Sequence, residues 1–487
     1  MMKKNDEEKQ KFLIKNAVGA VITALKSTGI TVKQSAAAVI SLIVSAGPFL
    51  VSGGMTTPVI IGQSLMFLLF FVCVIFFTSK RSSGWRNRQR TETEVILLSI
   101  LCACYFVAAY FIRNKTLFDG YMPSSTVLPG ALVVMLVSIS VDRRTGMMIA
   151  LILPMGVLLS GAIDTYSCLM GSASGAAGAL AVRNVRRRMD MVRAGVVIAA
   201  VNIVMVTAIL LIKGCPASLY PFILFWSAIN GLTSGMLVLG ILPMIENALH
   251  LATTFRLIEL LDTGAPILRK LESAAPGTYS HSMMVAYLAE AACNEIGARS
   301  LLARVGAYYH DIGKIDHPEY FVENQKMHNK HNELNPRLSA TIIRSHVKLG
   351  VEKARAIGLP TDVINIIAEH HGNSLIKWFY NAALGKEVQV NREDFCYPGN
   401  PPHSRESAVV MLADVTEAAS RTLEKPTVAR LEKFLGDLFK DKYDNGQLAE
   451  SALTFHDMET IKQSFVRTLV GFYHSRIEYP KVSADQN

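Results

Sequence analysis

The sequence lacks several patterns that would assign a chemistry at once. It has seven cysteines but no CxxC pair, so neither a cysteine-rich zinc site nor a disulfide framework is indicated. We interpret all seven as small buried hydrophobic residues. There is no HExxH zinc motif, no phosphate-binding P-loop and no Rossmann glycine pattern. Strand signals are scarce as well, and the expected fold class is therefore all-α.

Charged residues make up only 18% of the 487 residues, whereas hydrophobic residues make up 51% and the mean hydropathy is +0.30. The apolar residues concentrate before residue 246. A membrane-spanning helix needs about 20 predominantly apolar residues, and seven segments qualify. They are residues 57–78, 94–112, 124–141, 145–163, 166–182, 192–213 and 217–245. We expect residues 57–245 to form a seven-helix membrane domain.

Three details of this half lead to further expectations. Residues 1–56 form an N-terminal segment, in which the apolar stretch 35–54 predicts an additional span, the alternative being an external or re-entrant segment. The segment 166–182 is rich in Gly, Ala and Ser, which predicts a central position in the bundle. Asn202 and Asn230 lie inside predicted spans and predict interhelical hydrogen bonds.

Basic residues in the loops predict the orientation. They gather in three alternate loops, and the other loops carry little charge. The basic residues are Lys80, Arg81, Arg86, Arg88 and Arg90, then Arg143 and Arg144, then Arg183, Arg186, Arg187, Arg188 and Arg193. Because positive loops stay inside, this pattern predicts a multi-pass protein of the cell membrane with residues 246–487 in the cytoplasm. The formal net charge of +10 is then explained without a nucleic-acid polymer as partner.

Residues 246–487 predict a helical domain in contact with water. The stretch 246–262 has apolar residues at helical spacing and predicts a continuation of the last span. Further helical patterns occur at 281–297, 299–309, 337–357, 361–370, 404–424, 427–440 and 457–474.

The candidate chemistry lies in histidines that have acidic or histidine neighbours. Five imidazoles and two carboxylates stand out: His281, His310, Asp311, His346, His370, His371 and Asp414. A lone histidine on a helix is usually a packed or surface residue, but seven such side chains in one domain favour a site for first-row transition metals. This number of ligands exceeds one tetrahedral site and can supply two metals, if one carboxylate bridges them.

The stretches APGTYSHSMMVAYLAEAA, RVGAYYHDIGK, LSATIIRSHV, EHHGNSL and DFCYPGNPPHSRESAVVMLAD resemble the seven-transmembrane HD-domain family of cyclic di-AMP phosphodiesterases, members of the HD metal-dependent phosphohydrolases. The resemblance implies a cytoplasmic HD domain after a membrane bundle, and hydrolysis of cyclic di-AMP to pApA with two ions of iron or manganese. It also implies a ligand set: His281, His310, Asp311 and Asp414 for one ion, and Asp311, His346, His370 and His371 for the other. Asp311 would bridge, and Lys314 would lie near the phosphate.

The sequence also allows other functions. The substrate could be cyclic di-GMP or another nucleotide, although HDIGK is followed here by IDHPEYF rather than the continuation typical of the HD-GYP group. A membrane receptor whose HD domain only binds a nucleotide belongs to a different class of function. His328 and His331 fall outside the seven-residue set, and we expect loop roles for them, whereas Glu323 and Asn324 are candidates for nucleotide contacts.

Overall fold

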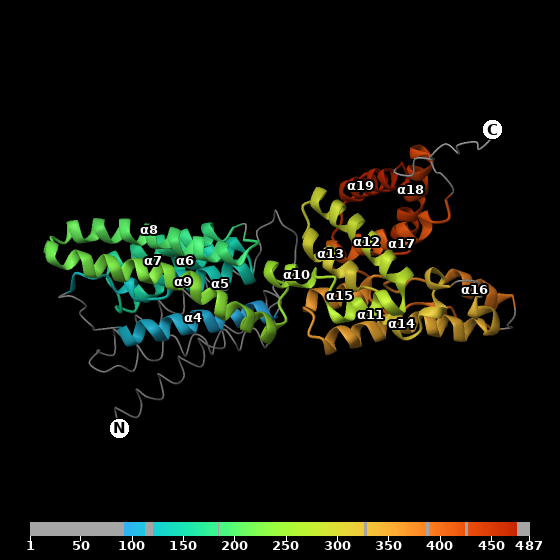
Figure 1. The fold of residues 1–487 in the computed structure, drawn as a ribbon, viewed down its shortest axis with the longest axis horizontal. Helices are drawn as coiled ribbons and strands as arrows, with labels where there is room; N and C mark the ends of the chain where they lie inside the picture. Colours follow the sequence, from blue (N-terminus) through green and yellow to red (C-terminus); the bar gives the residue numbers. More distant parts are fainter. Residues whose placement is uncertain are drawn as a thin grey trace, which may run out of the picture. The chain divides into compact units, whose positions relative to one another are not determined.

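The computed structural model describes residues 92–112, 120–183, 185–325, 329–385, 389–423 and 427–474. The chain divides into two compact units, Met1–Leu249 and His250–Asn487. Both are helical (Figure 1). The described residues contain no named strand, and an isolated antiparallel bridge joins Leu375 to Cys396. The predicted all-α class is confirmed.

The N-terminal unit contains long apolar helices. The described ones are α4 (Glu92–Ile112), α5 (Gly130–Ser140), α6 (Arg143–Leu159), α7 (Thr165–Ala181), α8 (Arg188–Ile212) and α9 (Tyr220–Leu249). Within this described part, three helical segments are long and apolar enough to cross a membrane: Thr93–Ile112, Arg188–Ile212 and Ala217–Leu249. The predicted spans at 57–78 and 35–54 lie outside the described residues.

The predicted span 124–141 differs from the structure. Residues Ser124–Thr126 form a short 3-10 turn, and the helix begins only at Gly130, directly after Pro129. Proline has no backbone N–H and disfavours helical geometry in the residue before it, so the regular helix starts after this position. Hydropathy alone does not reveal this break.

Small residues bring the helices of the bundle together. The helix α7 contacts α5, α6 and α8, in agreement with the central position that its composition predicts. A Cβ added to Gly231 of α9 would lie 2.3 Å from the backbone nitrogen of Ala199 in α8, so these two backbones meet directly. Asn202 donates to the Ser227 carbonyl at 3.2 Å, which confirms a predicted interhelical hydrogen bond.

The C-terminal unit consists of shorter helices around one hydrophobic core. Its helices are α10 (Thr254–Leu260), α11 (Pro266–Ala274), α12 (Pro276–Glu295), α13 (Ser300–Tyr309), α14 (Pro336–Ala356), α15 (Thr361–Glu369), α16 (Lys377–Leu384), α17 (Arg405–Ser420), α18 (Val428–Asp444) and α19 (Phe455–His474). Fully buried side chains such as Leu288, Val305 and Val409 join α12, α13 and α17 in this core. Two of these core helices also carry candidate site residues, His281 in α12 and Asp414 in α17.

The predicted continuation of the last span through 246–262 is wrong. The helix α9 ends at Leu249, and His250 adopts a φ of 50°, in the left-handed region. The next helix starts after Thr253, whose hydroxyl accepts a hydrogen bond from the Arg256 backbone and caps α10. Helical spacing continues through this stretch in the sequence, but the cap and the left-handed residue interrupt the helix.

Gly313, in the HDIG sequence, allows one close approach that matters for the site. It lies in the 3-10 helix η4 (Ile312–Asp316), where an added Cβ would lie 1.9 Å from the carbonyl oxygen of His346 in α14. Only a residue without a side chain fits there. The glycine thus lets the segment with His310 and Asp311 lie against the helix that carries His346.

The contact between α8 and α9 can be tested with a pair of glycines. Gly231→Ala should destabilise the N-terminal unit by about 1–3 kcal/mol, because the new methyl group meets backbone atoms that cannot rotate away. Gly240→Ala in the same helix is the matched control, since a Cβ there meets nothing within 4 Å. The measurement is the melting temperature of the full chain in detergent. Equal melting temperatures for both variants would contradict the close packing.

Candidate metal centre

The structure brings all seven candidate side chains together in the C-terminal unit. His281 comes from α12 and His346 from α14, while Asp414 comes from α17. The pairs His310–Asp311 and His370–His371 directly follow the last residues of α13 and α15. Six of the seven residues are buried, and the His371 side chain is 21% exposed.

Asp311 lies in the middle of this group. Its Oδ2 is 3.2 Å from Nε2 of His310 and 3.8 Å from Nε2 of His281. Its other oxygen, Oδ1, is 3.4 Å from Nε2 of His346 and 3.7 Å from Nε2 of His370. The two carboxylate oxygens therefore face two different sets of imidazoles, which is the arrangement that a bridging carboxylate requires.

The same kind of hydrogen bond to the backbone orients three imidazoles. His310 Nδ1 contacts the Ala307 carbonyl oxygen at 2.7 Å, and His346 and His370 make the same contact with the carbonyls three residues before them, at 2.6 and 2.8 Å. A carbonyl only accepts, so Nδ1 carries the proton and donates it. Each Nε2 then turns a lone pair toward the centre, as a metal ligand must.

His281 is held in a different way. Its Nε2 lies 3.0 Å from Oδ1 of Asp414, and its Nδ1 hydrogen-bonds to Glu417. Burial opposes the charged form, but these two carboxylates outweigh it and raise the pKa of His281 to about 10 in the chain without metal. Glu417 was not among the residues that the sequence singled out. Its position one turn after Asp414 on the same helix was the available signal.

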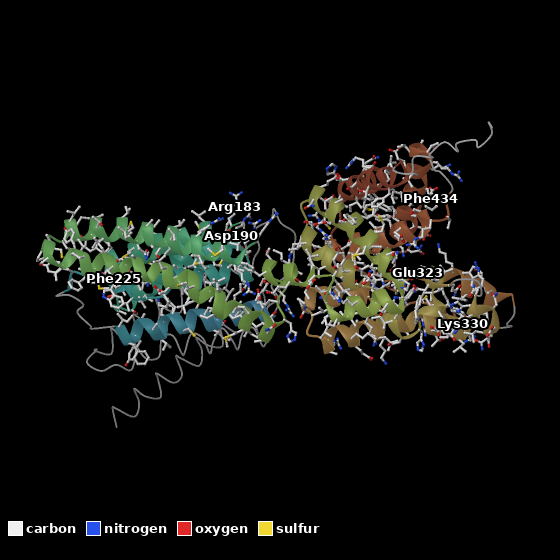
Figure 2. The ribbon with its side chains drawn as sticks, viewed as in Figure 1. Arg183, Asp190, Phe225, Glu323, Lys330 and Phe434 are labelled. Atoms are coloured by element: carbon white, nitrogen blue, oxygen red, sulfur yellow. The ribbon has the colours of Figure 1, made fainter. Side chains whose placement is uncertain are left out.

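Lys314 lies in the same site. Its ammonium is 2.6 Å from Asp311 and 2.9 Å from Glu323, and the residue is 9% exposed. Burial favours the neutral amine, but the Asp311 and Glu323 charges raise the pKa of Lys314 above its usual value. Glu323 (labelled in Figure 2) also accepts a hydrogen bond from Thr278 in the first turn of α12. Asn324 accepts from the Thr278 backbone nitrogen.

The donor set fits metal ions. Three overlapping groups have ligand atoms within 4.8 Å of one another: His346, His370 and His371; His281, His310 and Asp414; His310, Asp311 and His370. Oδ1 of Asp311 and Nε2 of His310 are buried and have no hydrogen-bond partner within the described residues. Such atoms are costly unless a ligand completes them.

Burial also prepares the imidazoles for binding a metal. It lowers the pKa of His346 to about 4 and that of His370 to about 3, so both are neutral near pH 7. Burial alone would raise the pKa of Asp311, but its interactions with His310 and Lys314 hold it well below its usual range. Neutral imidazoles such as those of His346 and His370, beside an ionised carboxylate, suit divalent transition metals.

A cavity of about 290 Å³ opens onto this group. Its lining includes the candidate ligands His281, His346, His371 and Asp414, together with Lys314 and Tyr397. The Tyr397 ring stacks on the His371 ring with centroids 4.2 Å apart. A substrate in this cavity would contact both the candidate ligands and Lys314.

His328 lies outside the described residues. His331 donates from Nε2 to the Tyr320 carbonyl at 2.7 Å, and its ring packs on Phe379 with centroids 4.9 Å apart. These contacts give His331 the loop role expected for it.

Known proteins resemble both halves of the chain. Residues 58–253 match the family described as "7TM receptor with intracellular HD hydrolase", and residues 278–419 match the HD domain family. All seven candidate ligands fall within the second match. A solved structure, that of the L. monocytogenes phosphodiesterase PgpH HD domain in complex with Cyclic-di-AMP, is 42% identical, covers 44% of this chain and 100% of that chain, and has a TM-score of 0.43.

Two full-length relatives match across both halves. The chain is 35% identical over 432 residues to "Cyclic-di-AMP phosphodiesterase PgpH" of Bacillus subtilis (strain 168), which is 87% of this chain and 60% of that protein. It is 32% identical over 420 residues to the protein of the same name from Listeria monocytogenes serotype 1/2a (strain 10403S), which is 85% of this chain and 58% of that protein. The chain thus spans about 60% of the length of these relatives. It belongs to the family of seven-transmembrane receptors with an intracellular HD hydrolase domain.

Proposed function

We propose that this chain is a membrane-bound phosphodiesterase that hydrolyses cyclic di-AMP to the linear dinucleotide pApA. The observation that carries the proposal is the group of seven histidine and aspartate side chains centred on Asp311, four of which line a cavity of about 290 Å³. The names of the two full-length relatives support cyclic di-AMP as the substrate. Cleavage adds water across one of the two phosphodiester bonds of the ring.

Two divalent transition-metal ions, iron or manganese, would be the cofactors. His281, His310, Asp311 and Asp414 would hold one ion, and Asp311, His346, His370 and His371 would hold the other. When bound, such ions polarise a phosphoryl oxygen and lower the pKa of a water so that it can attack phosphorus. The opposed Asp311 oxygens and the oriented imidazoles support this assignment.

The chain's own groups contribute charge and position. Lys314 supplies a buried cation beside Asp311, where it would neutralise an oxygen of the phosphodiester being cleaved. Glu323 and Thr278 hold the ammonium in that place. Glu417 fixes the ring of His281 from the side opposite Asp414, so that His281 presents Nε2 to the site.

The C-terminal unit would lie in the cytoplasm. Figure 2 shows Arg183 and Asp190 toward one end of the helical bundle and Phe225 toward the other. The end with Arg183 carries the basic loop between α7 and α8. At the other end, among the described residues, Lys213 pairs with Asp164 near the start of α7 at 3.1 Å. This difference in charge supports a basic side that faces inward.

The proposal predicts selective turnover. The purified full chain in detergent, loaded with manganese or ferrous iron, should convert cyclic di-AMP to pApA much faster than it converts cyclic di-GMP. Chromatographic separation of substrate and product measures both reactions. Binding of cyclic di-AMP without hydrolysis, in a chain with two bound metals, would favour a receptor. Faster turnover of cyclic di-GMP would contradict the proposed substrate.

The ligand assignment predicts a loss of metal together with a loss of activity. Asp311→Ala should abolish turnover and reduce the bound metal, since it removes the carboxylate that faces both sets of imidazoles. His456→Ala is the matched control, because His456 is an exposed histidine in α19. Metal content by elemental analysis and the hydrolysis rate are the two measurements. Full metal content in Asp311→Ala would contradict a bridging role.

The contact between Glu417 and His281 predicts a partial loss of metal affinity when the Glu417 charge is removed. Glu417→Gln removes the charge behind His281 while keeping the size of the side chain, and metal affinity should fall about 10–100-fold, as for other groups that orient a ligand. Glu459→Gln, at a surface residue that pairs with Lys462, serves as the control. Titration with manganese, followed by activity, measures the affinity. If high manganese does not restore most of the activity of Glu417→Gln, then Glu417 does more than orient His281.

A further inference from the structure

Three lysine and arginine side chains line the cavity of the candidate metal centre: Lys314, Arg421 and Lys442. Two of them already have carboxylate partners. Lys314 pairs with Asp311 and Glu323, and Arg421 makes two hydrogen bonds to Oε1 of Glu417, at 2.8 and 2.5 Å. These partners account for the charges of Lys314 and Arg421.

Lys442, in the last turn of α18, is different. Its ammonium donates to the Ser374 hydroxyl at 2.9 Å. Within the part of the chain that the structure describes, it forms no ion pair. Its neighbour Asp441 pairs instead with Lys377 at 2.7 Å. Lys442 is therefore a cation on the cavity wall whose charge is not matched by a carboxylate in contact.

The position of Lys442 is fixed relative to the candidate ligands. Ser374 belongs to the turn that follows His371, and its backbone nitrogen donates to the His371 carbonyl at 3.1 Å. At Gly372 in this turn, an added Cβ would lie 2.2 Å from Oε1 of Gln447, in the segment just after α18. The Gln447 backbone nitrogen donates to the Lys442 carbonyl at 3.0 Å. The end of α18 is thus packed on the turn that carries His371.

Burial also shifts the pKa of the Lys442 ammonium. It lowers the pKa of Lys442 below its usual value, although the negative charges of Asp414 and Asp441 oppose the shift. A partly buried cation without a contacting anion carries an uncompensated desolvation cost. An anionic group of the substrate that enters the cavity would remove this cost and form a charge-assisted hydrogen bond.

We propose that Lys442 binds the second phosphodiester of the cyclic dinucleotide, the one that is not being cleaved. This inference rests on the proposed function. A cyclic dinucleotide has two phosphodiesters, and the candidate metal ligands together with Lys314 account for one. Lys442 lines the same cavity from a different helix, α18, and leaves a positive charge there for the other. Lys442 is a substrate-binding residue in this scheme, and contact with the second phosphate distinguishes a cyclic dinucleotide from a substrate with one phosphodiester.

Kinetics of the full chain in detergent test this role. Lys442→Met keeps the aliphatic stem and removes the charge, and it should raise KM for cyclic di-AMP about tenfold or more, with kcat changed less than about threefold. Hydrolysis of bis(p-nitrophenyl) phosphate, which has a single phosphodiester, should change less than about twofold. Lys442→Arg should regain most of the affinity, and the metal content should equal that of the unmodified chain. Lys440→Met, at an exposed residue of the same helix, is the control.

A purely structural role for Lys442 predicts other results. Ser374→Ala removes the hydroxyl partner but keeps the ammonium, so a structural anchor predicts the same loss in Ser374→Ala as in Lys442→Met. Substrate binding predicts a KM for Ser374→Ala near that of the unmodified chain, and this expectation can be measured even if Lys442→Met does not fold. An unchanged KM in Lys442→Met, or equal losses on both substrates, would overturn the inference and leave the proposed function standing. If the unmodified chain does not hydrolyse cyclic di-AMP, both fall.

Discussion

The arrangement of the C-terminal unit depends on a buried carboxylate, that of Asp311, which is 1% exposed. An ionised carboxylate without water is unfavourable unless positive or hydrogen-bonding groups surround it. Lys314 at 2.6 Å provides the positive charge in the chain itself, and the imidazoles on both sides leave room for metal ions. The close approach at Gly313, which brings this segment against α14, serves to place that carboxylate between the two sets of imidazoles.

The ends of α13 and α15 position two of the candidate ligand histidines. The last carbonyl groups of a helix have no partner within the helix. Ala307 near the end of α13 and Ile367 near the end of α15 each offer such a carbonyl, and His310 and His370 use them as acceptors for Nδ1. The same construction appears twice, and it fixes both the ring orientation and the proton position. The ligand histidines are therefore prepared by backbone groups that need a partner in any case.

Most helices and the composition of the histidine group follow from local patterns in the sequence. Helical spacing predicts α12 to α15 and α17 to α19. An adjacent aspartate or histidine distinguishes His310 and His370 from loop histidines such as His331. The break at His250 depends on a left-handed residue followed by a cap, which hydrophobic spacing does not register. The sequence does not predict the roles of Glu417 and Lys442, because these roles depend on which helices meet at the cavity, which is a property of tertiary packing.

The charges around the cavity divide into those that build the site and those that remain for a substrate. Asp311 and Glu323 share Lys314, and Glu417 lies between His281 and Arg421, so each of these groups is already compensated. Lys442 faces the cavity without such compensation. A site built only to hold metals would have no need of a further, partly buried cation. A site for a substrate with two phosphates does, because the metals and Lys314 can neutralise only the phosphate that is attacked.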